Sequence, residues 1–521
     1  MSQDAALYAP QKTLQRAGSL FSKLTIHNVL TATVFAALFA LAAVPRIDVD
    51  LGWHLRTGQL ILETGTIPHS DPYSFTVAGQ PWITHEWLSE IIMYPLYANW
   101  GFGALIFFFA VVLVAGLWLV YRQIREDGVD QTLASVVLGL SAFAAMGVWG
   151  TRPLVFTLFL APLYALLLRR WWRGDTRALL PLPFTMVVWV NLHGGYMFGL
   201  GLVAVYLVAA IAARWLGPQQ THGSLRALAI VGAACLLATL VNPNGYHILW
   251  YPFDTLTSEA MRKYLGDWPS PDFHQVRYWP FAIMLALFFI SAARARQRMG
   301  LADLLLVLAL AAMGLQSNRH VPLFAVIVGP VLARQLPSLT EDLKSLVVRT
   351  KLVERFRNAN REAPAKLTTV LNLLVLLLIV GTVGIRVAQA LPNEASLEVQ
   401  REYFPADAVV YIRQNDIKGR IYNAYNWGGY LVLHLYPENR VFIDSRADVY
   451  RDEFIEKYLE TYYIRPDWPA ALANYAVDYV LVESQGPLHN LLAVTGDWQE
   501  IYRDDVAVLL KHTTPYAQAA P

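Results

Sequence analysis

Acidic and histidine side chains are concentrated in one segment, residues 48–87, which reads DVDLGWHLRTGQLILETGTIPHSDPYSFTVAGQPWITHEW. Asp48 and Asp50 are two residues apart, and His54 follows Asp50 at the i, i+4 spacing that puts two side chains on one helix face. Side chains of these types bind divalent metals or transfer protons. The remaining ionisable candidates of the segment are Asp71, His85 and Glu86.

The alternative interpretation of this segment is a solvated connector whose polar residues cap helices. Loops of about forty residues inside compact domains are usually functional or disordered. The segment is rich in aromatic residues, Trp53 among them, and a partial helical stripe runs through Leu55, Leu60 and Ile61. That composition is not typical of disorder, so we favour a functional loop.

The overall composition is that of a membrane protein. Of the 521 residues, 55% are hydrophobic and only 15% are charged, against about 25% charged in soluble domains. The net charge of +2 gives no indication of a nucleic-acid partner. The single cysteine, Cys235, excludes an internal disulfide and a cysteine-based metal site.

Apolar stretches of near-spanning length predict a polytopic α-helical protein with about eleven spans. The first is interpreted as a retained anchor and not as a cleaved signal peptide. The predicted spans are 26–45, 102–121, 131–149, 153–168, 179–192, 197–213, 227–242, 279–293, 301–316, 321–335 and 367–388.

The distribution of Lys and Arg predicts an inner N-terminus and an outer C-terminus, because inner loops are enriched in these residues. Basic residues gather in alternate connectors, from Lys12 near the start to the stretch 344–366. The segment 46–101 then forms a large first outer loop. Other distinctive polar residues also fall on the outer side: Arg152, His193, Arg319 and His320. Ionisable groups at membrane depth indicate function, so we expect one outward-facing cavity.

After about residue 391 the sequence becomes that of a soluble domain. Strand-like apolar segments at 420–435, 439–450, 477–484 and 506–512 alternate with helical stretches near 405–414, 450–462 and 467–475. We therefore predict a transmembrane domain over 1–391 and an α/β extracytoplasmic domain over 392–521. Gly428 and Gly429 indicate a turn or a close backbone approach.

The first outer loop resembles that of the type C glycosyltransferases, polytopic enzymes that use polyprenyl-phosphate-linked sugars. It is similar to the oligosaccharyltransferase pattern of an Asp, an aromatic residue, a His or Asn and an Arg, followed by a helix ending in Gly-x-x-Pro. The matching residues are Asp50, Trp53, His54, Arg56, Gly65 and Pro68. The WWD acceptor motif of oligosaccharyltransferases is absent from 392–521, which argues against transfer to asparagine of a protein.

The resemblance implies transfer of a sugar from a lipid-linked donor to an acceptor glycan, lipid or protein, on the outer face of the inner (plasma) membrane. Asp50, or Asp48, would act as the base, and cationic side chains would stabilise the departing phosphate. The candidates for contact with that phosphate are Arg319, His320, Arg152 and His54. Mg or Mn would be held, in a metal-dependent enzyme, by Asp50, Asp48, His85 and Glu86. Trp53, Asp71 and His193 are expected elsewhere in the cavity.

Two other functions stay open at this point. A transporter or flippase would carry polar residues near mid-membrane in two matching halves, and no such symmetry is visible in the hydropathy. A non-catalytic assembly protein would use the outer domain to bind a partner, and it leaves the acidic loop unexplained.

Overall fold

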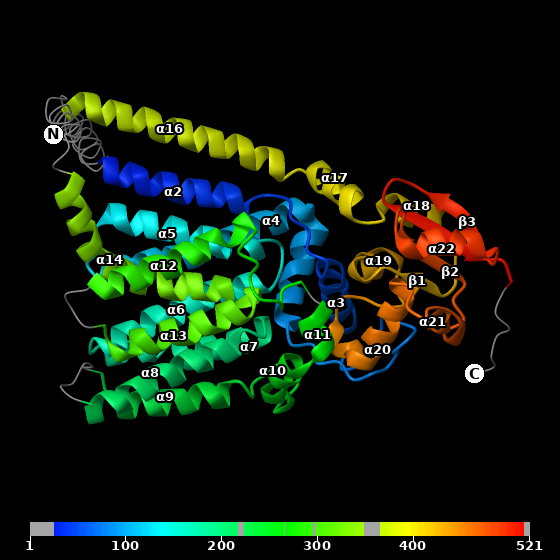
Figure 1. The fold of residues 1–521 in the computed structure, drawn as a ribbon, viewed down its shortest axis with the longest axis horizontal. Coiled ribbons are helices and arrows are strands. Elements are labelled where there is room, and N and C mark those ends of the chain that lie inside the picture. Colours follow the sequence, from blue (N-terminus) through cyan, green and yellow to red (C-terminus); the bar gives the residue numbers. More distant parts are fainter. Residues whose placement is uncertain (1–24, 217–222, 265, 295–298, 348–364, 515–521) are drawn as a thin grey trace, which may run out of the picture.

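The computed structural model describes residues 25–216, 223–264, 266–294, 299–347 and 365–514. Its helices form a bundle in which long helices lie roughly side by side, and a smaller α/β part sits at one end of the bundle (Figure 1). The bundle helices are α2 (Ile26–Ala42), α4 (Trp87–Glu126), α5 (Gln131–Ala145), α6 (Leu154–Trp172), α7 (Leu182–Leu192), α8 (Tyr196–Leu216), α9 (Leu225–Ala238), α12 (Trp279–Arg294), α13 (Leu301–Gln316), α14 (Val321–Val347) and α16 (Ala365–Ala390).

Each of the eleven predicted spans coincides with one of these helices. Among the described residues, seven helices are long and apolar enough to cross a membrane, and four shorter apolar helices accompany them. The number of spans and the orientation stay predictions. The basic residues expected on the inner side within 1–24 and 348–364 lie outside the described residues.

The first outer loop contains helix α3 (Leu51–Thr64) and the first turns of α4. Helix α3 ends at Gly65, whose φ of 68° lies in the left-handed region that glycine adopts without strain, as the Gly-x-x-Pro pattern predicted. Helix α4 bends at Gly101, where φ is 72°. A Cβ at Gly101 would lie 2.2 Å from Asn393 Oδ1, so this glycine also permits a close contact with the next part of the chain.

The α/β part contains a four-stranded sheet of order β1-β2-β4-β3. Strand β1 (Ile421–Asn423) is parallel to β2 (Tyr479–Glu483), whereas β4 (Ala507–His512) is antiparallel to β2 and to β3 (Trp498–Arg503). The surrounding helices are α17 (Asn393–Tyr403), α18 (Ala406–Gln414), α19 (Gly428–Leu435), α20 (Ala447–Tyr462), α21 (Pro469–Asn474) and α22 (Pro487–Thr495). The expected strand character of 428–435 is wrong, because this segment is helix α19.

The first outer loop and the α/β part pack as one body. Val441 N–H donates to the Tyr73 carbonyl at 3.0 Å, and Phe75 N–H donates to the Val441 carbonyl at 3.1 Å. Helix α3 packs directly on α19, where a Cβ at Gly52 would lie 2.1 Å from the Gly429 carbonyl oxygen. Gly52 and Gly429 therefore allow the two helix backbones to approach closely, which places the acidic start of α3 beside the α/β part.

Candidate functional site

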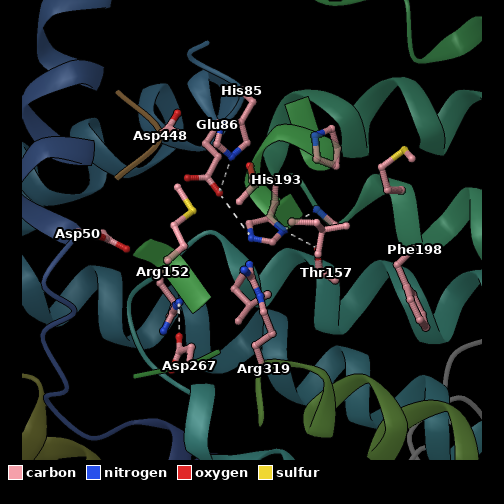
Figure 2. Close-up of a pocket in the computed structure, with 18 of the residues that line it drawn as sticks. Asp50, His85, Glu86, Arg152, Thr157, His193, Phe198, Asp267, Arg319 and Asp448 are labelled. Carbon is pink, nitrogen blue, oxygen red and sulfur yellow. Dashed lines mark hydrogen bonds and ion pairs between the residues drawn. The ribbon is translucent and has the colours of Figure 1, made fainter. Parts of the chain in front are cut away.

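A cavity of about 810 Å³ lies where one end of the helix bundle meets the predicted first outer loop and the α/β part. Figure 2 shows charged side chains converging on it from several elements. Nine of the eleven predicted site residues line this cavity: Asp48, Asp50, Trp53, His85, Glu86, Arg152, His193, Arg319 and His320. The predicted convergence of the outer connectors is therefore observed, while the role of each residue stays a prediction.

Asp48 and Asp50 lie in different surroundings. Asp48 forms an ion pair with Arg152, with Oδ2 and Nη1 3.1 Å apart, and its other oxygen accepts the Asp50 backbone N–H at 3.0 Å. Arg152 also approaches Asp267 at 3.7 Å. Asp48 is thus held in place, and Arg152 already has carboxylate partners.

Asp50 has no ion-pair partner among the described residues. Trp53 Nε1 donates to Asp50 Oδ1 at 3.4 Å, and this group also donates to Ser445 Oγ at 3.1 Å. Burial, with repulsion from Asp48, raises the pKa of Asp50 to about 7. A carboxylate with a pKa near neutrality is suited to accept a proton from an acceptor hydroxyl.

Glu86, at the start of α4, is surrounded by imidazoles. His54 Nε2 lies 3.4 Å from one carboxylate oxygen, and Nε2 of both His85 and His193 lies 3.5 Å from the other. Burial opposes ionisation, but His85 and the other histidines hold the pKa of Glu86 below its usual range. In return, and again against the effect of burial, Glu86 raises the pKa of His85 to about 9. Glu86 is therefore an anion at neutral pH, paired with a protonated His85.

Arg319 and His320 occupy the turn before α14. The Arg319 guanidinium lies over the Trp268 ring, 4.6 Å from its centroid, and makes no ion pair with a described residue. Nδ1 of His320 is buried without a hydrogen-bond partner in the described structure. This corner of the cavity therefore holds a positive charge that makes no direct ion pair with a described carboxylate.

One part of the cavity wall is apolar and extends between α8 and α13 (Figure 2 shows Phe198 on the far side from Asp50). This apolar arm is lined by side chains from both helices and by neighbouring residues: Met197, Phe198, Leu202, Val205, Leu306, Leu310, Met313 and Leu323. One end of the cavity thus suits charged groups, and the other suits a hydrocarbon chain.

Two predicted site residues do not line the cavity. His54 is buried beneath it, with Nδ1 3.2 Å from Glu90 and Nε2 near Glu86, so the expectation that it contacts a phosphate is corrected. Asp71 is also buried and forms an ion pair with Arg446 at 2.6 Å. Asp71 therefore stabilises the contact between the first outer loop and the α/β part. It does not line the cavity, which corrects the expectation from the sequence.

The α/β part supplies cavity residues that sequence reasoning missed. Asp448, Tyr425 and Ser445 all line it. The Arg446 side chain positions this wall, since it bonds Asp444 and Asp71 and lies over the rings of Tyr73 and Trp82. The sequence signal that could have identified these cavity residues is the presence of charged side chains inside the otherwise apolar segment 441–450.

A metal site is not evident in the described structure. Among those residues, no group of three or more His, Cys, Asp or Glu side chains is arranged to hold a metal ion. The predicted set divides instead between Asp48, which pairs with Arg152, and Glu86, which pairs with histidines. The predicted ligands therefore do not form a site that fits Mg or Mn in the described structure.

No protein-family model matches the chain, and no curated protein matches its sequence. Its fold is similar to solved structures. The oligosaccharyltransferase of Archaeoglobus fulgidus, tethered to an acceptor peptide with the NVT sequon, is 13% identical, with a TM-score of 0.53 over 89% of this chain and 70% of its own. The same enzyme, AglB, in complex with an inhibitory peptide and a dolichol-phosphate, gives a TM-score of 0.50 at 14% identity over 87% and 69%.

Two bacterial structures share the fold. ArnT from Cupriavidus metallidurans in the apo state is 14% identical, with a TM-score of 0.50 over 92% of this chain and 97% of its own. The arabinofuranosyltransferase AftD from Mycobacteria is 12% identical, with a TM-score of 0.52 over 95% and 40%. The chain has the type C glycosyltransferase fold, as its first outer loop predicted.

Proposed function

We propose that this protein is a membrane glycosyltransferase that moves a sugar from a polyprenyl-phosphate-linked donor to an acceptor, on the outer face of the plasma membrane. The shared fold supports the reaction class, and the dolichol-phosphate bound by AglB supports the class of donor. The acceptor is a glycan, a lipid or a protein.

The observation that carries the proposal is the two-ended cavity. Its apolar arm between α8 and α13 matches a polyprenyl chain, and its ionic end matches a phosphate and a sugar. A phosphate placed at the junction of the two ends would meet Arg319, whose planar guanidinium suits bidentate phosphate contact.

Asp50 is the proposed base. It takes the proton of the acceptor hydroxyl while the acceptor oxygen bonds to the anomeric carbon, and the bond from that carbon to the phosphate oxygen breaks. The electron pair of the broken bond leaves with the polyprenyl phosphate, where Arg319 stabilises the charge. Asp48 is the less suitable base, because Arg152 and the Asp50 backbone N–H already occupy its oxygens.

The orientation of the chain is part of the proposal. Segments near 350 and 450 should lie on opposite sides of the membrane, because the basic stretch 344–366 favours the inner side. Reporter fusions at these two positions test this. Both reporters on the same side would remove the argument for an outer active face.

The function is tested with purified protein and a panel of polyprenyl-phosphate sugars, by measuring release of polyprenyl phosphate. Asp50→Asn should lower release by about a hundred- to ten-thousandfold, whereas Asp407→Asn, a control at an exposed carboxylate on α18 that pairs with Arg401, should not. Addition of EDTA, then of Mg or Mn, tests the metal requirement. Movement of intact donor across a vesicle membrane without release of phosphate would identify a transporter instead.

A further inference from the structure

We propose that His193 is a neutral hydrogen-bond donor to the phosphate of the lipid-linked donor, and that Thr157 and Gly195 fix its tautomer for this task. The inference rests on the proposed function for its ligand. Its structural part, the position of one proton on the imidazole, is independent of that function.

His193 lies in the connector between α7 and α8 and reaches the centre of the cavity (Figure 2). Three hydrogen bonds converge behind it. Trp189 Nε1 donates to Thr157 Oγ1 at 2.9 Å, Thr157 Oγ1 lies 2.8 Å from His193 Nδ1, and the Gly195 backbone N–H donates to the same Nδ1 at 2.9 Å.

The Gly195 bond decides the tautomer. A backbone N–H is only a donor, so Nδ1 of His193 must be the acceptor and carries no proton. Thr157 accepts from Trp189, which leaves its own hydroxyl proton to donate to Nδ1. In the neutral imidazole the proton is therefore on Nε2.

The Nε2–H group points into the cavity and has no close protein acceptor among the described residues. Glu86 Oε1 is 3.5 Å away, beyond the roughly 2.7–3.2 Å of an N–H···O hydrogen bond. Because Nδ1 accepts the Gly195 N–H, the imidazole holds its single proton on Nε2 and is neutral. His193 thus offers one fixed N–H without a charge of its own.

An anion between Arg152 and Arg319 is the ligand that fits this donor. Arg319 has no ion pair with a described residue, and the apolar arm starts beside these groups. A phosphate there would accept one hydrogen bond from Nε2 and one or two from Arg319. No proton is transferred by His193, so its role differs from that of Asp50.

Gly195 provides a second means of testing the arrangement. A Cβ at this position would lie 2.1 Å from Thr157 Oγ1, so Gly195→Ala must displace Thr157 from His193. Thr157→Val removes the hydroxyl and keeps the shape of the side chain. Thr157→Ser restores the hydroxyl, and Thr185→Val is a matched control on α7, because the hydroxyl of Thr185 bonds Tyr164 and backbone carbonyls instead.

The first experiment is long-range 1H–15N NMR of the full chain in detergent, with 15N-labelled histidine. The His193 signal is assigned by its loss in His193→Gln. We expect the neutral Nε2–H tautomer from pH 5 to 8 in the wild type, in Thr157→Ser and in Thr185→Val, and a mixture of tautomers in Thr157→Val and Gly195→Ala. A protonated imidazole or the Nδ1–H tautomer in the wild type would overturn the inference, whatever the enzyme does.

The second experiment measures binding of farnesyl phosphate, with farnesol as the uncharged control. A lost hydrogen bond to a charged group predicts about tenfold weaker binding of the phosphate or more in His193→Ala, with partial recovery in His193→Gln and unchanged binding of farnesol. Equal phosphate binding by wild type and His193→Ala would overturn the assignment alone. Absence of phosphate binding by the wild type would overturn it together with the proposed function.

Discussion

Two ionic clusters lie at opposite ends of α4 and α13, and they differ in how completely their charges are paired. The second cluster, away from the cavity, consists of Asp127, Arg169, Arg173, Asp303 and Arg334. Asp127 contacts all three arginines, and Arg334 contacts Asp303 at 2.7 Å. Its side chains come from four chain segments, and every charge in it has an opposite charge beside it.

The cluster at the cavity uses the same kinds of side chain without complete pairing. Among the described residues, neither Arg319 nor Asp50 has an ion-pair partner, and both line the cavity. Burial of paired charges fixes the geometry of a bundle, whereas burial of unpaired ones is costly unless a ligand completes them. The comparison indicates that unpaired charge beside a cavity, and not charge as such, marks the functional end.

The largest effect is expected from Asp50→Asn. The substitution keeps the size of the side chain and removes its basicity, so the rate of transfer should fall by about a hundred- to ten-thousandfold. Because burial disfavours the charged form of Asp50, which raises its pKa to about 7, the variant should unfold no more easily than the wild type. Single-turnover rates and thermal unfolding check the two statements.

Asp48→Asn separates the two acids. It should lower activity less than Asp50→Asn, because Asp48 acts by holding Arg152. A dead Asp48 variant beside an active Asp50 variant would reverse the assignment within the pair.

Asp127→Asn tests the other side of the comparison. Removal of one partner from a buried ion pair destabilises a protein by about 3–5 kcal/mol, since Arg169, Arg173 and Arg334 lose their shared partner. Chemical denaturation of the purified protein in detergent measures this loss. The protein that remains folded should keep the wild-type catalytic rate; a large loss of rate per folded molecule would show that the two clusters are not separable in function.

The sequence predicted the bundle well because its signal is local. All eleven apolar stretches are helices, and Gly65 ends α3 as its spacing to Pro68 suggested. Side-chain types and the predicted outer location of their connectors also identified nine residues that line one cavity. The resemblance in the first outer loop supplied the fold class.

What could not be predicted depends on contacts between distant segments. Asp71 appears in the sequence as another acid of the loop, and only the position of Arg446 shows that it is structural. Segment 428–435 has strand-like composition, yet Gly429 packs on α3 and the segment forms a helix. Asp448 lines the cavity because Arg446 holds the preceding turn in place. Arg446 does so through its contact with Asp71, which lies 375 positions away in the sequence.

Arg319→Lys should reduce kcat/KM by about ten- to a hundredfold, the loss expected for one charge-assisted hydrogen bond. Lysine keeps the charge but cannot form the planar, bidentate contact that we propose with phosphate. The matched control is Arg277→Lys, an arginine over Tyr278 near the start of α12, which should leave kcat/KM unchanged. An unaltered kcat/KM in Arg319→Lys would mean that a positive charge alone suffices at this corner of the cavity. The functional difference between the cavity and the fully paired cluster would then depend on the unpaired carboxylate of Asp50.

The smallest effect is the pH dependence of the wild type. Burial and Asp48 raise the pKa of Asp50 to about 7, and only the ionised carboxylate accepts a proton, so activity should fall as the pH drops below that value. About one molecule in ten carries the ionised form one pH unit below the pKa, which predicts a roughly tenfold lower kcat/KM at pH 6 than on the plateau. The residual activity of Asp50→Asn should lack this acidic limb. Its persistence would assign the titration to another cavity carboxylate, for which Asp448 is the candidate, because burial raises its pKa as well. The unpaired charge that distinguishes the two clusters would then belong to the α/β part.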